Sequence, residues 1–98
     1  MKIRWLRQGL EELHYAVAYV REDNPTAARR LYQTVRKQVA ILADFPQFGR
    51  TGRVEGTREL VITGWPYVVT YRIKGQEVII LAVRHAAREW PDDFPTDE

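Results

Sequence analysis

The sequence contains no cysteine, which excludes disulfides, thiolate chemistry and the common structural zinc sites. It has two histidines, His14 and His85, on segments far apart, so neither a metal site nor a cofactor is expected. No apolar run approaches the roughly 18 residues that span a bilayer, and the N-terminus lacks the apolar stretch of about 7–15 residues typical of a signal peptide. These absences favour one cytoplasmic domain of 98 residues that has no membrane partner.

Negative charge is scarce outside the C-terminus. Four acidic residues follow Pro91 (Asp92, Asp93, Asp97 and Glu98), so residues 1–91 carry 15 basic against 9 acidic side chains, a net charge of +6. Arginine predominates, and its guanidinium group suits bidentate contact with phosphate or carboxylate. We therefore expect a globular domain over residues 1–91, an acidic tail over 92–98 and a polyanionic partner, either nucleic acid or an acidic protein. An arginine-rich solvated surface without a function is the alternative.

Hydrophobic periodicity changes twice in the first half of the chain. Residues 2–5 alternate between polar and apolar, which predicts a short strand, and leucines and valines at helical spacing then predict a helix over 6–22. Asn24 and Pro25 are typical of a helix N-cap and first helical position. The second helix runs from there to about residue 44. It buries Leu31, Val35, Val39 and Leu42 and presents Arg29, Arg30, Arg36 and Lys37 on other faces.

Three strands are predicted in the second half, after a glycine-containing loop over residues 46–57. The strands cover residues 58–62, 67–73 and 77–85, and their short turns require antiparallel neighbours. Residues 78–83 are all apolar, as in a central strand covered on both faces. We therefore predict a two-layer α+β fold of order β-α-α-β-β-β, with a helical hairpin packed on a mainly antiparallel four-stranded sheet.

The remaining candidates for chemistry form a basic constellation in the second half of the chain. It consists of Arg50, Arg53, Arg58, Arg72, Arg84, His85 and Arg88. If the loop and the end of the last strand meet, these groups form a phosphate- or carboxylate-binding cleft. His85 then acts as acid or base while arginines stabilise developing negative charge.

Each of these residues also has a purely structural interpretation. His85 shares strand parity with Ile79, Leu81 and Val83, which is consistent with a hydrogen-bonded histidine at the edge of the core. Arg84 and Arg88 would then pair with Glu89 or with acids of the tail. Arg50 and Arg53, taken singly, would be ordinary loop residues.

Three segments together resemble the RelE/ParE superfamily of bacterial type II toxin–antitoxin toxins. They are PQFGRTGRVEGTRELVI, PYVVTYRI and VIILAVRHAAREW. The resemblance implies a small basic toxin that is held inactive by a cognate antitoxin and reaches operator DNA only through that antitoxin. RelE-like members cut messenger RNA on the ribosome without metal, whereas ParE-like members inhibit DNA gyrase. The target implied is therefore either DNA gyrase or the ribosome with its mRNA.

The resemblance assigns roles unevenly along the chain. Val68 occupies the position of a catalytic arginine in RelE-like enzymes, and a terminal tyrosine is missing unless Trp90 replaces it. A ParE-like gyrase inhibitor is therefore the first prediction; a RelE-like endoribonuclease is the alternative, and a degenerate toxin that only forms the antitoxin complex is the third. The catalytic residues of a ribonuclease would be His85, Arg88 and Arg58. The residues expected to bind the target or nucleic acid are Arg50, Arg53, Arg72, Arg84 and Trp90.

Overall fold

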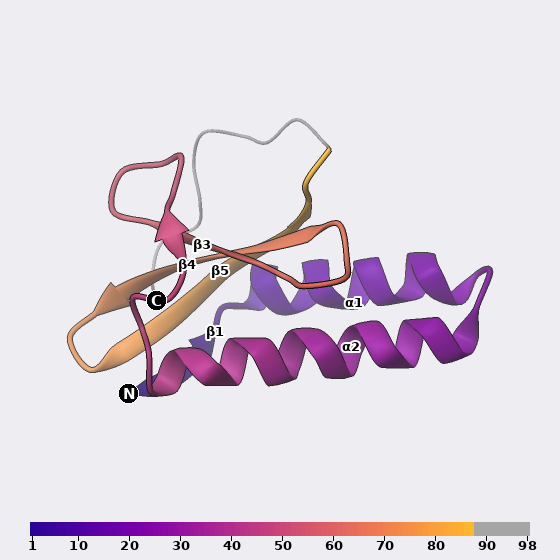
Figure 1. Ribbon diagram of the computed structural model, residues 1–98, viewed down its shortest axis with the longest axis horizontal. Coiled ribbons are helices and arrows are strands. Elements are labelled where there is room, and N and C mark those ends of the chain that lie inside the picture. Colours follow the sequence, from indigo (N-terminus) through magenta and orange to yellow (C-terminus); the bar gives the residue numbers. More distant parts are fainter. Residues whose placement is uncertain (88–98) are drawn as a thin grey trace.

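The computed structural model describes residues 1–87, which fold into two layers (Figure 1). The elements in chain order are β1 (Lys2–Trp5), α1 (Arg7–Arg21), α2 (Pro25–Ala40), a 3-10 turn η1 (Ile41–Ala43), β2 (Arg50–Thr51), β3 (Arg58–Val61), β4 (Tyr67–Lys74) and β5 (Glu77–His85). Their sheet order is β1-β5-β4-β3-β2, and the helical hairpin covers one face. The predicted α+β class and helical hairpin are confirmed. The predicted domain end at residue 91 and the acidic tail over 92–98 lie outside the described residues.

The second helix begins where the sequence predicts, because its first turn is capped. The side-chain oxygen of Asn24 accepts a hydrogen bond from the backbone N–H of Ala27 at 3.0 Å. Pro25 occupies the first helical position, where the helix requires no N–H donor. The buried positions of α2 recur at helical spacing and are Ala28, Leu31, Val35 and Val39. This stripe packs against α1 and the sheet, so the polar side of α2 faces outward.

The sheet has five strands rather than the four predicted. Arg50 and Thr51 pair with Glu59 and Arg58 to form β2, which lies inside the segment predicted as a loop. The sequence around this two-residue strand lacks periodicity, so pattern alone does not reveal it. Its pairing depends instead on the Glu59 carboxylate of β3, which binds Arg50 from the neighbouring strand. β1 pairs in parallel with β5, and all other pairs are antiparallel.

The interior strand β5 contains an extra residue that breaks its alternation. Tyr71 of β4 pairs with Ile80, while the preceding Thr70 pairs with Ala82, which leaves Leu81 as a bulge. The alternation of side chains between the two sheet faces therefore shifts by one residue at the bulge. Ile80 joins Val83 in the main core beneath the helices, whereas a second buried cluster contains Leu6, Ile79, Leu81 and Ala82. The prediction that His85 shares a face with Ile79 and Leu81 was wrong for this reason, whereas the face that it shares with Val83 is confirmed.

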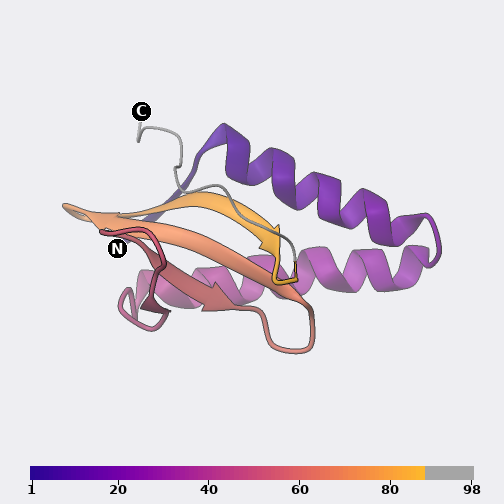
Figure 2. The same ribbon diagram turned by 90° about the horizontal axis from the view of Figure 1, so that it is seen from above.

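Helix α1 seals the edge of β5 beyond the end of β1. β1 pairs only with the first half of β5, as far as Ile80, so the later N–H groups of that edge need other partners. The backbone of α1 approaches closely here: a Cβ on Gly9 would lie 3.1 Å from the Ile80 carbonyl oxygen. One turn further along, Glu12 accepts a hydrogen bond from the Val83 N–H at 2.9 Å. Figure 2 shows α1 alongside β5 and α2 behind the sheet.

Candidate functional site

A tyrosine from the sheet fixes the loop that carries the predicted binding arginines. The Tyr71 hydroxyl donates to the Pro46 carbonyl at 2.7 Å and accepts from the Gly49 N–H at 2.9 Å. The Tyr71 side chain is fully buried, and Gly49 is buried against it. These two bonds join β4 to a segment more than twenty residues away in sequence. The start of the loop is thus held by specific contacts, with Phe48 and Arg50 on either side of the anchored glycine.

Glu59 on β3 holds the rest of the loop. Its Oε1 accepts from the Nε and Nη2 of Arg50 at 3.1 and 2.9 Å, and its Oε2 accepts from the backbone N–H of Arg53 at 3.0 Å. Only 8% of the Glu59 side chain is exposed, against 61% of the Arg50 side chain. A nearly buried carboxylate therefore positions two arginines whose outer surfaces remain open to solvent. Neither Glu59 nor Tyr71 was among the residues predicted for the site.

Arg58 binds backbone carbonyl groups of the same loop. Its Nη1 donates to the carbonyl oxygens of Gly49 at 2.8 Å and Gln47 at 3.4 Å. Arg58 pairs with Tyr71 across β3 and β4, so both side chains act on the same loop from the same end of the sheet. The guanidinium group thus binds backbone carbonyls of this chain. This arrangement gives Arg58 a structural contact in the described part of the molecule.

Arg72 and Arg84 lie on the sheet face opposite the main core. Arg84 of β5 pairs with Val68 of β4, and Arg72 of β4 pairs with Ile79 of β5. Val68 and Arg72 are four positions apart on β4, so about 13 Å along the strands separates the two arginines. The Arg84 side chain is only 11% exposed, and its Nε lies 3.5 Å from the Glu12 carboxylate on α1. Arg72 is half-buried. The two groups are therefore separated, and Arg84 is engaged by an acid that the sequence did not indicate.

His85 lies on the other side of the sheet from Arg84. It pairs with Tyr67 at the end of β5, and the two rings meet edge-on with centroids 5.4 Å apart. Its Nδ1 accepts a hydrogen bond from the backbone N–H of Ala87 at 3.1 Å. The register partners of His85 and Arg58 are Tyr67 and Tyr71, four positions apart on β4, about 13 Å. These two predicted catalytic residues therefore do not converge.

The remaining predicted site residues, Arg88 and Trp90, lie outside the described residues. Within residues 1–87 the structure holds no cluster of three or more histidine, cysteine or acidic side chains arranged to bind a metal. In the same part of the chain, no helix has the length and apolar character needed to cross a membrane.

Burial gives Tyr71 a distinct response to alkaline pH. Desolvation raises the pKa of its phenol above 10.0, opposed by the Gly49 hydrogen bond and by the positive charge of Arg58. The pKa of Tyr71 is higher in the folded state than in the unfolded state, so folding favours the protonated phenol. The stability that the protonated phenol contributes is fully present below about pH 10 and is lost as pH rises through the folded-state pKa. Tyr71→Phe should cost about 1 kcal/mol at neutral pH and weaken the alkaline fall in stability.

Urea denaturation across a pH series measures both effects of Tyr71→Phe. Tyr19→Phe is the matched control, because it removes the same hydroxyl from a side chain that is 60% exposed. An unchanged alkaline profile for Tyr71→Phe would contradict the role assigned to the buried phenol.

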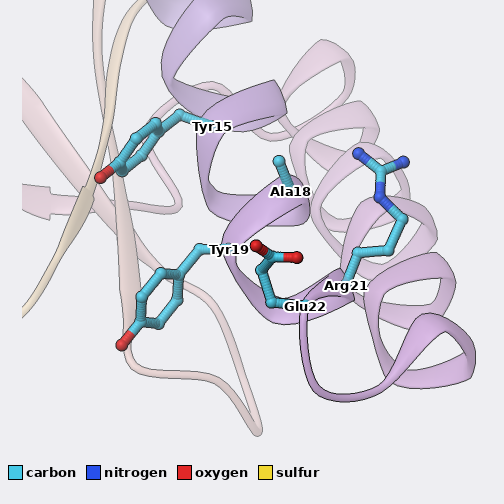
Figure 3. Close-up of a pocket in the computed structure, with 5 residues that line it drawn as sticks. All are labelled: Tyr15, Ala18, Tyr19, Arg21 and Glu22. Carbon is cyan, nitrogen blue, oxygen red and sulfur yellow. The ribbon is translucent and has the colours of Figure 1, made fainter.

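Exposed aromatic side chains lie in two places, on α1 and on the loop before β2. Tyr15 and Tyr19 are 63% and 60% exposed, and Figure 3 shows them projecting from the same side of α1, with Glu22 beside Tyr19. In Figure 1 the turn between the two helices extends past the sheet, so this end of α1 overhangs the strands. On the loop, Phe45 and Phe48 are 62% and 66% exposed. Exposed aromatic rings of this kind suit contacts with proteins.

Known proteins resemble this chain over most of its length. The sequence pattern of the family described as "ParE toxin of type II toxin-antitoxin system, parDE" matches residues 3–90. A protein of Sinorhizobium fredii named "Putative toxin Y4kP" is 42% identical over 90 residues, which cover 92% of this chain and 93% of that protein. "Toxin RelE2" of Caulobacter vibrioides is 32% identical over 87 residues, covering 89% of this chain and 97% of that protein.

A solved structure has the same fold. It is titled "Chromosomal ParDE TA system from P. aeruginosa", and it superposes on this chain with a TM-score of 0.80 at 27% sequence identity. The match covers 87% of this chain and 95% of the other. The arrangement of two helices on a mostly antiparallel sheet is therefore shared with a toxin–antitoxin protein, as the quoted sequence segments predicted.

Proposed function

Because this chain belongs to the ParE toxin family of type II toxin–antitoxin systems, we propose that it arrests growth by binding and inhibiting DNA gyrase. It is the toxin of such a module, and a cognate antitoxin is its partner. Gyrase acts on chromosomal DNA, so we place the action of the toxin in the cytoplasm. The alternative, RNA cleavage on the ribosome, requires several side chains of this chain to act on one phosphate.

The separation of His85 from Arg58 favours a binding protein over a nuclease. His85 packs on Tyr67, whereas Arg58 donates to loop carbonyls at the other end of β4. Cleavage through the 2′-OH needs an acid or base and a cation within hydrogen-bond reach of the same group. The side chain at the position of the RelE-like catalytic arginine is the buried Val68. This arrangement is the main support for an inhibitory binding function.

The loop over residues 46–57, which Tyr71 and Glu59 hold in place and which we call the anchored loop, is the surface that we propose contacts the target. Arg50 is fixed by Glu59 yet mostly exposed, Arg53 is exposed beside it, and Phe48 precedes the anchored Gly49. Arginine and aromatic residues are enriched among the residues that dominate binding energy at protein interfaces. Because the loop is held in place before binding, less conformational entropy is lost on contact. Arg72 and Trp90 stay within the proposed binding set, whereas Arg84 leaves it, because its side chain is only 11% exposed and is paired with Glu12.

Induction of the toxin in a bacterial host separates the two functions. We expect plasmid DNA to lose supercoiling and transcripts to stay intact on polysomes, and the purified chain to inhibit supercoiling by purified gyrase. His85→Ala should leave growth arrest unchanged, because His85 touches the core rather than the proposed loop surface.

Thermal denaturation is the control for His85→Ala, because a variant that unfolds through loss of the Tyr67 contact would arrest growth less whatever the target. Arg50→Ala is the opposite test and should weaken gyrase inhibition. Rapid cleavage of transcripts that disappears with a folded His85→Ala variant would overturn the proposal in favour of an endoribonuclease.

A further inference from the structure

The cations of this chain fall into two groups with different surroundings. Several of those on the sheet have acidic partners: Arg4 pairs with Glu77, Arg50 with Glu59 and Arg84 with Glu12. Helix α2 differs, because its sixteen residues include four cationic side chains and no acidic one. The four are Arg29, Arg30, Arg36 and Lys37, and all are exposed. The concentrated positive charge therefore lies on α2 rather than on the loop surface proposed to bind the target.

The four cations form one face of α2, which we call the α2 basic face. At 100° per residue they lie within an arc of about 120° that is centred near Gln33. This arc points away from the buried stripe that includes Leu31 and Val35. Arg29 and Arg36 are seven positions apart, as are Arg30 and Lys37, so each pair spans about 10 Å along the helix. In Figure 1 the sheet lies on one side of α2 and leaves its other side open.

No acid neutralises the α2 basic face within the described part of the chain. Arg29, Arg30 and Lys37 make no ion pair or side-chain hydrogen bond with any of residues 1–87. Arg36 stacks over the half-buried rings of Trp5 and Tyr32, at 5.4 and 5.8 Å from their centroids. The positions three and four residues from each cation, where a pairing acid would stabilise the helix, hold no acidic residue.

We propose that the α2 basic face binds the phosphate backbone of duplex DNA without sequence preference. Clustered lysine and arginine are the footprint of phosphate contacts. A protein partner would need apolar or aromatic anchors, but the exposed residues among these cations are Gln33 and Ala40. Unpaired bases would need exposed rings for stacking, whereas Trp5 and Tyr32 lie beneath Arg36. Cations spaced regularly along one helix fit the regular phosphates of a duplex.

The α2 basic face adds DNA binding to the inhibition of the target that we propose for the toxin. The family resemblance implied that operator DNA is reached only through the antitoxin, whereas the α2 basic face gives the toxin a direct contribution to DNA affinity. The inference does not depend on gyrase as the target, because DNA binding is measured without gyrase. The face also lies on α2, apart from the loop that carries Arg50.

Fluorescence anisotropy of the full chain with a short labelled DNA duplex of arbitrary sequence tests the proposal over a range of salt concentrations. The double variant Arg30→Gln/Lys37→Gln should weaken binding at least tenfold at low salt. It should also reduce the slope of log K against log salt by about 1.8, since each phosphate contact contributes about 0.9. Lys2→Gln/Arg7→Gln makes the same change in net charge elsewhere and should have a much smaller effect.

Gln33→Glu tests the same face without removing a cation. Gln33 is three or four residues from all four cations, so the new carboxylate supports the helix while it competes with phosphate. We expect DNA binding to weaken and the melting temperature to stay the same or rise; Gln76→Glu, on the turn between β4 and β5, is the matched control.

Three outcomes would overturn the proposal. The first is an absence of duplex binding at low salt, and the second is equal weakening by both double variants. The third is loss of binding to antitoxin or to single-stranded RNA, rather than to DNA, when Arg30 and Lys37 are replaced.

Discussion

Replacing Gly49 by alanine is expected to lower the free energy of unfolding by about 3 kcal/mol, near the upper end for overpacking of a buried site. A Cβ at this position would lie 2.6 Å from the Tyr71 hydroxyl, 2.8 Å from Tyr71 Cε1 and 2.8 Å from the Glu59 carbonyl oxygen. Two of these neighbours belong to a fully buried ring and the third is backbone of β3, so none moves without disturbing the sheet. The loop would separate from β4 and lose the Gly49–Tyr71 hydrogen bond.

Chemical denaturation of Gly49→Ala measures this cost, and Gly9→Ala is the comparison within the same chain. At Gly9 the nearest contact is 3.1 Å, and alanine favours the helix, so the two effects oppose each other and we expect a change below about 1 kcal/mol. Combining Gly49→Ala with Tyr71→Phe removes the closest contact, and the double variant should therefore lose less than the sum of the two single variants. Strict additivity, or a Gly49→Ala cost as small as that of Gly9→Ala, would contradict the tight packing of the loop.

The elements of the fold were largely predictable because their signals are local. Asn24 with Pro25 defines the start of a helix through neighbouring backbone groups, and the apolar run ending before Arg84 defines a buried strand. The bulge at Leu81 was not predictable, because an extra residue in an all-apolar strand changes no pattern in the sequence. Only the pairing with β4 reveals which side chains face the helices.

The site was less predictable because its partners are distant in sequence. Arginine content and the family resemblance identified Arg50 and Arg53, yet neither indicated that Glu59 would hold both. Glu12 reaches Arg84 from a helix 72 positions earlier, and nothing near either residue in the sequence indicates the pair. The best available signal was Glu59 itself, an acid in a predicted strand that is followed directly by the apolar residues Leu60, Val61 and Ile62. Charge alone does not distinguish a cation that binds a partner from one that holds the fold.

Glu59→Ala is expected to show the difference between those two roles. Removal of the carboxylate leaves the buried side of the loop without the acceptor for the Arg53 N–H and without the pair to Arg50. We expect a loss of about 2 kcal/mol, most of it from the buried acceptor, because the Arg50 side chain is 61% exposed and its ion pair is screened by solvent. Arg50 and Arg53 are still present in the variant, but the carboxylate no longer holds them in place. Gyrase inhibition should therefore fall about tenfold at temperatures where the variant is folded.

Glu55→Ala is the matched control, since it removes the same charge from an exposed position in the same loop. It should change stability by less than about 0.5 kcal/mol and leave gyrase inhibition unchanged. Binding of duplex DNA should be insensitive to both substitutions, because the α2 basic face lies on another element. If Glu59→Ala and Glu55→Ala behave alike in stability and inhibition, the buried carboxylate does not position the arginines. If Glu59→Ala instead abolishes DNA binding while α2 stays folded, the two surfaces are not independent.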